Sequence, residues 1–205
     1  MSAPHPWREA EDHLAASDPV IRQLIGRYGP CRLEPNNDFF GILCNSIISQ
    51  QLATKAAAAI HARFIAYYDN NLTPARVAES AFEDLRGLGL SNQKATYIQD
   101  LASKVLAGEV TPERFPAMPD EDIIKQLVTV KGIGVWTAQM FLIFALNRPD
   151  VLPTDDFGVR KAIMVLYQLN AMPGKAVMEP IAKPWQPWRS VASWYLWRSL
   201  DNKPM

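Results

Sequence analysis

Apolar residues recur at helical spacing along almost all of this 205-residue chain. No stretch alternates apolar and polar residues between two turn signals, as a half-buried strand would. Apolar residues make up 48% of the chain, which is enough to bury a full core without disulfides or metal ions. The sequence therefore predicts an all-α fold, arranged as one compact domain or as two closely packed lobes.

Capping residues and helix breakers mark where the helices are expected. Asn37 or Asp38 can cap a helix from residue 39, and Ser91 can cap another that Gly108 ends. Further helices are expected over residues 53–68, 74–81, 119–128, 135–146 and 188–200, and from Asp155 or Asp156 onward. Prolines between residues 173 and 187 predict a loop, and the first 35 residues are too few for a second domain. We expect residues 1–205 to form a single unit of two helical lobes.

The chain has only two cysteines, Cys31 and Cys44. They are too few for a disulfide framework, a cysteine-based zinc site or a four-cysteine iron–sulfur cluster. No apolar run approaches the roughly 20 residues that span a bilayer, and residues 1–9 lack the apolar core of a secretory leader. We expect a soluble, intracellular protein with no membrane partner.

Charge is distributed unevenly along the sequence, although the formal net charge is zero. Residues 1–122 carry 11 Lys+Arg against 16 Asp+Glu, whereas residues 123–205 carry 10 against 5. An excess of cations favours contact with a polyanion. The C-terminal part is therefore predicted to be the side that faces one.

Two glycines, Gly132 and Gly134, separate two apolar helical stretches, with Lys131 beside them. Glycines in this spacing let the backbone turn tightly and expose amide groups at the start of the second helix. Such a helix start attracts phosphate without contacting a base. The alternative is that the glycines only form a tight corner between two helices.

A longer string around these glycines is more specific. Val130-Lys-Gly-Ile-Gly-Val-Trp-Thr-Ala138, with an aspartate about 20 residues later, resembles the helix-hairpin-helix DNA glycosylases of the HhH-GPD superfamily, in the DNA-3-methyladenine glycosylase II branch. Three other segments, residues 48–55, 89–94 and 187–197, are similar to family segments in the same order. The resemblance covers roughly residues 39–200, with the hairpin at about 125–146. It implies an active site between two helical lobes, in a compact form that lacks the N-terminal α/β domain of many relatives.

The resemblance places the catalytic acid at Asp156. Cleaving an N-glycosidic bond builds positive charge on the sugar, so a nearby carboxylate stabilises the transition state and orients or deprotonates the attacking water. Asp155 is then a helix cap or a solvated neighbour. The alternative is that both aspartates serve only as caps of the helix that follows.

Trp136 occupies the position where the strand-cleaving members of the family carry a lysine nucleophile. The resemblance thus implies a monofunctional enzyme that uses water. An indole face there can stack on a cationic, alkylated purine, and Met140 and Trp197 also match pocket positions. Met140 departs from the aromatic residue of the best-known members. The alternative interpretation for all three is a place in the core.

DNA contacts are implied at two loops. The hairpin supplies Lys131, Gly132, Gly134 and Val135, and the loop with Gln50, Gln51 and Leu52 lies where the family inserts a wedge into the gap left by a flipped base. Gln51 matches by position, whereas Leu52 is more apolar; a polar turn between helices is the alternative. Lys55, Lys94 and Arg160 could contact phosphate or lie on a solvated face.

The family often binds a structural Na⁺ or K⁺ on backbone carbonyls of the hairpin, here those of Val128, Val130 and Ile133. No cofactor is required. The expected function is monofunctional removal of alkylated purines from double-stranded DNA by a monomer, in base excision repair. The alternatives are a non-catalytic helix-hairpin-helix DNA-binding module and a bifunctional glycosylase/lyase.

Overall fold

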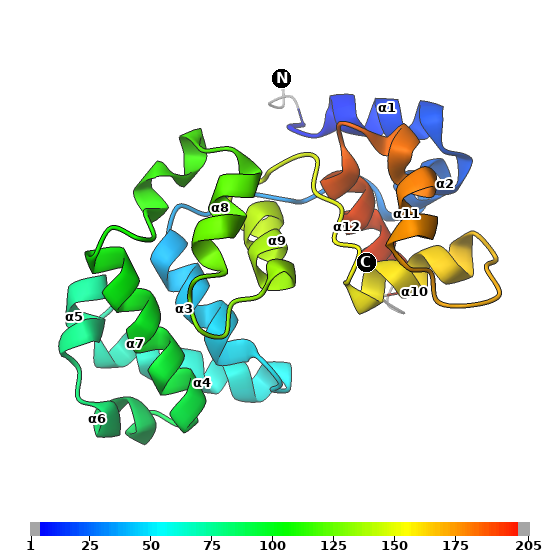
Figure 1. Ribbon diagram of the computed structural model, residues 1–205. Helices are drawn as coiled ribbons and strands as arrows, with labels where there is room; N and C mark the ends of the chain where they lie inside the picture. Colours follow the sequence, from blue (N-terminus) through cyan, green and yellow to red (C-terminus); the bar gives the residue numbers. More distant parts are fainter. Residues whose placement is uncertain (1–4, 201–205) are drawn as a thin grey trace. The chain divides into compact units, whose positions relative to one another are not determined.

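A computed structural model of the protein describes residues 5–200, and this part is built from helices and turns without a strand (Figure 1). The prediction of an all-α fold is confirmed. Residues 1–4, which begin the N-terminal segment considered for a leader, lie outside the described residues. The chain divides into two compact units: unit 1 contains residues 1–35 and 142–205, and unit 2 contains residues 36–141.

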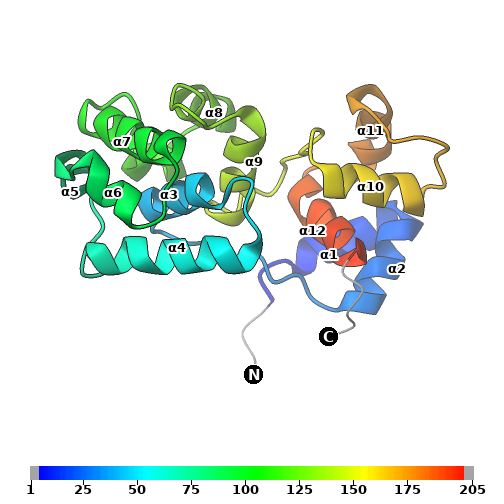
Figure 2. The same cartoon turned by 90° about the horizontal axis from the view of Figure 1, so that it is seen from below.

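Unit 2 is arranged around α3 (Phe39–Ser49), which buries Leu43, Cys44, Ile47 and Ile48. This helix packs against both α4 (Thr54–Tyr67) and α7 (Asn92–Leu106) (Figure 2). The remaining elements are the short α5 (Pro74–Glu79) and α6 (Phe82–Gly87), the 3₁₀ helix η1 (Pro112–Ala117), α8 (Asp120–Leu127) and the first part of α9 (Val135–Phe144).

Side-chain caps fix the starts of three helices in unit 2, α3, α5 and α7. Asp38 caps α3 by accepting from the Gly41 amide at 3.0 Å, and Ser91 caps α7 by accepting from the Lys94 amide at 3.2 Å. Both caps were expected from the sequence. Helix α6 was not expected, and the helix predicted over residues 74–81 ends at Glu79.

Unit 1 combines both ends of the chain. It contains α1 (Arg8–Ser17), α2 (Pro19–Tyr28), the end of α9, α10 (Phe157–Leu166), α11 (Lys175–Ala182), the 3₁₀ helix η2 (Lys183–Trp185) and α12 (Arg189–Leu200). The loop predicted between residues 173 and 187 is wrong in part, because α11 forms there with Pro180 inside it. Burial of the apolar face of α11, where Met178 and Ala182 are fully buried, stabilises the helix by more than the loss of one amide hydrogen bond at Pro180 destabilises it.

Two buried carboxylates connect the N-terminal helices to the C-terminal ones. Glu11 accepts the Tyr195 hydroxyl at 2.8 Å and the Cys31 amide at 2.7 Å. Asp18 caps α2 with one oxygen, and its other oxygen accepts from the Tyr167 hydroxyl at 2.6 Å and the Trp185 indole at 2.8 Å. The first 35 residues therefore complete the core of unit 1.

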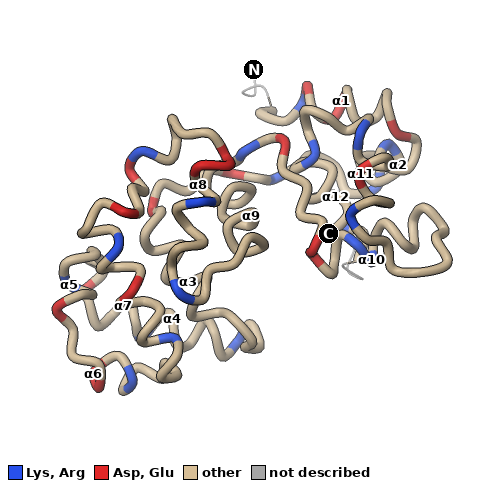
Figure 3. The backbone as a smooth tube through the Cα atoms, in the orientation of Figure 1, with Lys and Arg blue, Asp and Glu red and all other residues tan. Residues whose placement is uncertain are grey.

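In the folded protein, the acidic first part and the basic last part of the sequence do not form separate units. Unit 1 carries 12 Lys+Arg and 10 Asp+Glu, and unit 2 carries 9 and 11, with the two signs interspersed on both (Figure 3). Unit 1, which holds most of the basic C-terminal part, therefore keeps only a small excess of cations. Between residues 5 and 200, no helix is long and apolar enough to cross a membrane.

We expect Asp18→Ala to lower the free energy of unfolding by about 3 kcal/mol, because two buried donors lose a charged acceptor and α2 loses its cap. Urea denaturation followed by circular dichroism measures this change. Asp12→Ala is the matched control, since Asp12 forms an exposed pair with Arg8 and should change stability little. Equal losses in the two variants would contradict the role of the Asp18 contacts.

Candidate active site and DNA-contact loops

Asp156 is a buried carboxylate at the start of α10, with 7% of its surface exposed. Its Oδ1 atom accepts hydrogen bonds from the Val159 amide and from the Trp197 indole Nε1, each at 2.8 Å. The positive end of a helix also favours a negative charge at this position. These two hydrogen bonds therefore fix the direction of the carboxylate.

The helix cap is Asp156 and not Asp155, whose side chain is exposed. The interpretation of Asp155 as the cap is wrong, because the Val159 amide points to Asp156. Capping and catalysis are thus not alternatives for Asp156: a cap bond to Oδ1 orients the carboxylate that a reaction would use.

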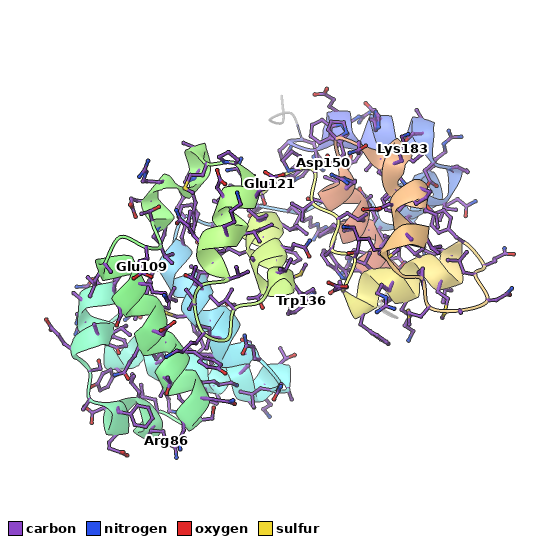
Figure 4. The ribbon with its side chains drawn as sticks, in the orientation of Figure 1. Arg86, Glu109, Glu121, Trp136, Asp150 and Lys183 are labelled. Atoms are coloured by element: carbon purple, nitrogen blue, oxygen red, sulfur yellow. The ribbon has the colours of Figure 1, made fainter. Side chains whose placement is uncertain are left out.

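The chain that leads to Asp156 is fastened to the start of α12. Arg189 binds both oxygens of Asp150, at 2.6 Å from Nε and 3.0 Å from Nη2. Ser190 accepts the Val151 amide at 2.9 Å through its hydroxyl and donates its own amide to the Pro149 carbonyl at 2.9 Å. Asp150 is labelled in Figure 4. These contacts fix the segment before α10 relative to the helix that carries Trp197.

Trp197 on α12 contacts Asp156 closely because Gly158, at the start of α10, has no side chain to separate them. A Cβ atom on Gly158 would lie 2.9 Å from Cδ1 and 3.2 Å from Nε1 of Trp197, and 3.1 Å from Oδ1 of Asp156. The indole ring also lies 5.3 Å from the ring of Phe144. No role was expected for Gly158 from the sequence, although it follows the predicted catalytic Asp156 by two positions.

Trp136 is the second residue of α9 and is 44% exposed, so the alternative of a core tryptophan is wrong (Figure 4). It lines a cavity of about 480 Å³ together with Met140, Gln50 and Gln51. The remaining lining residues are Ser46, Ser49 and Thr137. Four of the residues expected at the site thus meet at one cavity of unit 2, while Asp156 and Trp197 lie in unit 1.

The two hairpin glycines have different physical roles. Gly132 has a left-handed φ of 82°, and a Cβ atom there would lie 2.1 Å from the Tyr97 ring. Gly134 has no left-handed φ, and a Cβ atom there would meet nothing within 4 Å. The expectation that both glycines are needed for the turn is therefore wrong for Gly134. The open space beside it lies next to the amides of the first turn of α9.

Asp100 on α7 holds the rest of the hairpin in place. Ile133 is buried, whereas Lys131 and Val135 are exposed. Asp100 on α7 accepts the Lys131 amide at 2.9 Å and lies 3.8 Å from its ammonium group. The Val130 carbonyl, one of the three expected cation ligands with those of Val128 and Ile133, accepts the Ile133 amide at 3.1 Å.

The turn between α3 and α4 is exposed and unusual in conformation. Gln51 has a left-handed φ of 55°, and Leu52 is 38% exposed. The Gln50 side chain donates to the Gly132 carbonyl at 2.7 Å, which joins this turn to the hairpin. Lys94 is half-buried next to the turn, and its ammonium group donates to the carbonyl oxygens of Ile48 and Gln50, so it does not lie on a fully solvated face. Only the tertiary contacts reveal this residue, because nothing in its local sequence distinguishes it.

The two thiols are excluded from nucleophilic chemistry by their burial. Burial raises the pKa of Cys31 to about 12, and burial raises that of Cys44 as well. Both stay protonated near neutral pH, and no group of three or more metal-ligating side chains occurs within residues 5–200.

We expect Gly158→Ala to separate Trp197 from Asp156 and to lower the free energy of unfolding by about 1–2 kcal/mol, because the new methyl group overpacks the contact. Faster solvent exchange of the Trp197 indole N–H in nuclear magnetic resonance spectra measures the loss of this bond. Gly26→Ala is the control, since a Cβ on this helical glycine meets nothing within 4 Å. An unchanged exchange rate would contradict the assignment.

Comparison with known proteins places the chain in a family. A family model described as "HhH-GPD superfamily base excision DNA repair protein" matches residues 44–187. DNA-3-methyladenine glycosylase 1 of Schizosaccharomyces pombe is 34% identical over 197 residues, covering 93% of this chain and 86% of that protein. The putative DNA-3-methyladenine glycosylase YfjP of Bacillus subtilis is 37% identical over 169 residues. The match covers 79% of this chain and 59% of that longer protein.

A solved structure shares the fold. The Schizosaccharomyces pombe 3-methyladenine DNA glycosylase in complex with abasic DNA superposes with a TM-score of 0.81 at 33% identity, covering 93% of this chain and 96% of that one. The likeness thus reaches beyond residues 39–200, on which the sequence motifs lie. The chain belongs to the HhH-GPD superfamily of base excision DNA repair proteins, in the branch of the DNA-3-methyladenine glycosylases.

Proposed function

We propose that this protein is a monofunctional DNA glycosylase that binds double-stranded DNA as a monomer, flips out an alkylated purine and hydrolyses its N-glycosidic bond. The observation that carries the proposal is the buried carboxylate of Asp156, held by the Val159 amide and the Trp197 indole. The names of the relatives at 33–34% identity support the substrate class. The product is an abasic site in an intact strand.

Asp156 supplies the electrostatic part of the reaction. As the bond from C1′ to the base nitrogen breaks, its electron pair leaves with the base and positive charge develops on the sugar. The carboxylate stabilises that charge, and it orients the water whose oxygen bonds to C1′. The proton lost by the water is accepted by the carboxylate or by solvent. Because the cap bond and the indole fix the carboxylate beforehand, little reorganisation is needed in the transition state.

Trp136 and Met140 select the base in this proposal. Alkylation of a purine at N3 or N7 makes it cationic, which weakens the glycosidic bond and strengthens stacking on an electron-rich indole. The cavity of about 480 Å³ beside Trp136 has the size of a small-ligand site. Its lining contains no lysine, so a Schiff base with the sugar has no nucleophile there.

The hairpin and the α3–α4 turn form the proposed DNA interface. Lys131 and the amides near Gly132, Gly134 and Val135 bind the phosphate backbone, and the space beside Gly134 lets a phosphate approach the helix start. Gln51 or Leu52 fills the gap that the flipped base leaves.

The proposed site for a monovalent cation is formed by the carbonyl oxygens of Val128, Val130 and Ile133, and a backbone hydrogen bond from the Ile133 amide to the Val130 carbonyl at 3.1 Å closes the turn between the last two. Neutral carbonyl oxygens suit Na⁺ or K⁺, since they supply ligands without a net charge to balance a divalent ion. When bound, the ion adds a positive charge at the hairpin and supplies no chemical step. No further cofactor is proposed.

Asp156→Asn should lower the rate of base release at least about 100-fold, because the neutral amide does not stabilise the charge on the sugar. The amide oxygen can keep the cap bond to Val159, so folding should be retained. Single-turnover release of methylpurine from methylated duplex DNA measures the rate. Asp155→Asn is the control. Asp155 is exposed and does not cap the helix, so this variant should remain active.

The same assay separates the proposal from its two rivals. Released methylpurine with intact strands supports hydrolysis by water. Bound but unchanged DNA would identify a non-catalytic DNA-binding module, and direct nicking of the strand would identify a glycosylase/lyase.

Trp136→Ala should reduce excision of cationic 7-methylguanine about tenfold, as expected when a desolvated cation–π contact is lost, and should affect neutral hypoxanthine less. Rates for both bases in otherwise identical duplexes measure the difference. Equal losses for the two bases would contradict stacking on a cation as the source of selectivity.

A further inference from the structure

The turn of residues 50–53 between α3 and α4, here called the wedge turn, has a conformation that its own sequence does not favour. Gln51 adopts a left-handed φ of 55°, which costs free energy for a residue with a side chain. The last carbonyl groups of α3 also lack partners within the helix. Contacts from elsewhere in unit 2 must therefore hold this turn.

Lys94 of α7 supplies those contacts. Its ammonium group donates to the carbonyl oxygens of Ile48 and Gln50, each at 2.7 Å. A positive charge is favourable at the C-terminal end of a helix, where these two carbonyls lie. Partial burial lowers the pKa of Lys94 by removing water from its charged form, and the two carbonyls replace part of that hydration.

The same face of α7 also contacts the hairpin. Tyr97, one turn after Lys94, packs against Gly132 so closely that no Cβ fits there. Asp100, one turn further, accepts the Lys131 amide at 2.9 Å. Residues three apart on a helix lie on one face, so Lys94, Tyr97 and Asp100 form a continuous support.

A direct contact joins the two supported loops. The Gln50 side chain donates to the Gly132 carbonyl at 2.7 Å, and Gln50, Gln51, Leu52, Lys94, Tyr97 and Gly132 all line one cavity of about 430 Å³. The wedge turn and the hairpin are therefore held to one helix and to each other before any DNA is bound.

We infer that Lys94 is a positioning residue for base flipping, which fixes the wedge turn at a set spacing from the hairpin. This inference rests on the proposed glycosylase function. Filling the gap left by a flipped base must offset an unstacking cost of a few kcal/mol. A turn that is already ordered loses less conformational entropy on binding than one that orders on DNA. Lys94 thus lowers the free-energy cost of keeping the flipped base outside the DNA double helix.

The test compares two substrates that differ only in pairing. One is a duplex in which 7-methylguanine is paired with cytosine, and the other carries the same base in a single-nucleotide bulge, where less unpairing is required. Lys94→Met keeps the apolar stem and removes the ammonium group. We expect single-turnover excision to fall about tenfold on the paired duplex and less than about threefold on the bulge, since a tenfold loss corresponds to about 1.4 kcal/mol of flipping free energy.

Two further variants serve as controls. Lys104→Met makes the same change on the same helix, where the ammonium group pairs with Glu109 at 2.9 Å, and should leave both rates unchanged. Lys94→Arg keeps the charge and can donate to both carbonyls, so it should recover most of the loss. Circular dichroism melting curves establish whether each variant is folded.

The possible outcomes are distinct. Equal losses on both substrates, no loss on either, or failure of both Lys94 variants to fold would overturn the positioning role. Weaker binding of Lys94→Met to undamaged duplex, with a reduced dependence on salt, would show a phosphate contact instead and also overturn it. Failure of the wild-type protein to release 7-methylguanine from either substrate would refute the proposed function itself.

Discussion

The buried carboxylates of Glu11 and Asp18 are the interactions on which unit 1 depends. Each lies on or beside the first two helices, and each binds hydroxyl or indole groups from the last third of the chain. A buried carboxylate without partners is costly, so the N-terminal and C-terminal helices are stable only together. Because Tyr167 follows α10 and Tyr195 lies on α12, these bonds also fix the two helices that carry Asp156 and Trp197.

Close contacts between a glycine and an aromatic ring shape both the surroundings of Asp156 in unit 1 and the hairpin in unit 2. Gly158 lets the Trp197 indole reach Asp156, and Gly132 lets Tyr97 pack against the hairpin. In each case a single methyl group would separate a functional group from its support. Gly134 differs, because the protein itself leaves the space beside it open. Packing within the protein therefore does not require the absence of a side chain at Gly134.

Several polar side chains stabilise the fold and prepare the site at the same time. Asp156 caps α10 with the oxygen that also accepts the Trp197 indole. Lys94 completes the end of α3 and in doing so holds the turn that carries Gln51 and Leu52. Local sequence patterns offer a structural and a functional interpretation for such residues as alternatives. The contacts make the two interpretations compatible, because a single hydrogen bond can cap a helix and also orient a group of the proposed site.

The sequence by itself determined the helical fold, the cap at Ser91, the glycine hairpin and the family, and it narrowed the cap of α3 to Asn37 or Asp38, because these features depend on residues close together in the chain. The bond from the Trp197 indole to Asp156 and the contacts of Lys94 with the wedge turn join residues 40 or more positions apart. The exposure of Trp136 likewise depends on how distant segments pack. The role of the first 35 residues in unit 1 was likewise missed, since only packing pairs them with the end of the chain. Tertiary structure decided these features because hydrogen-bond satisfaction of buried groups is a property of the folded core and not of any local segment.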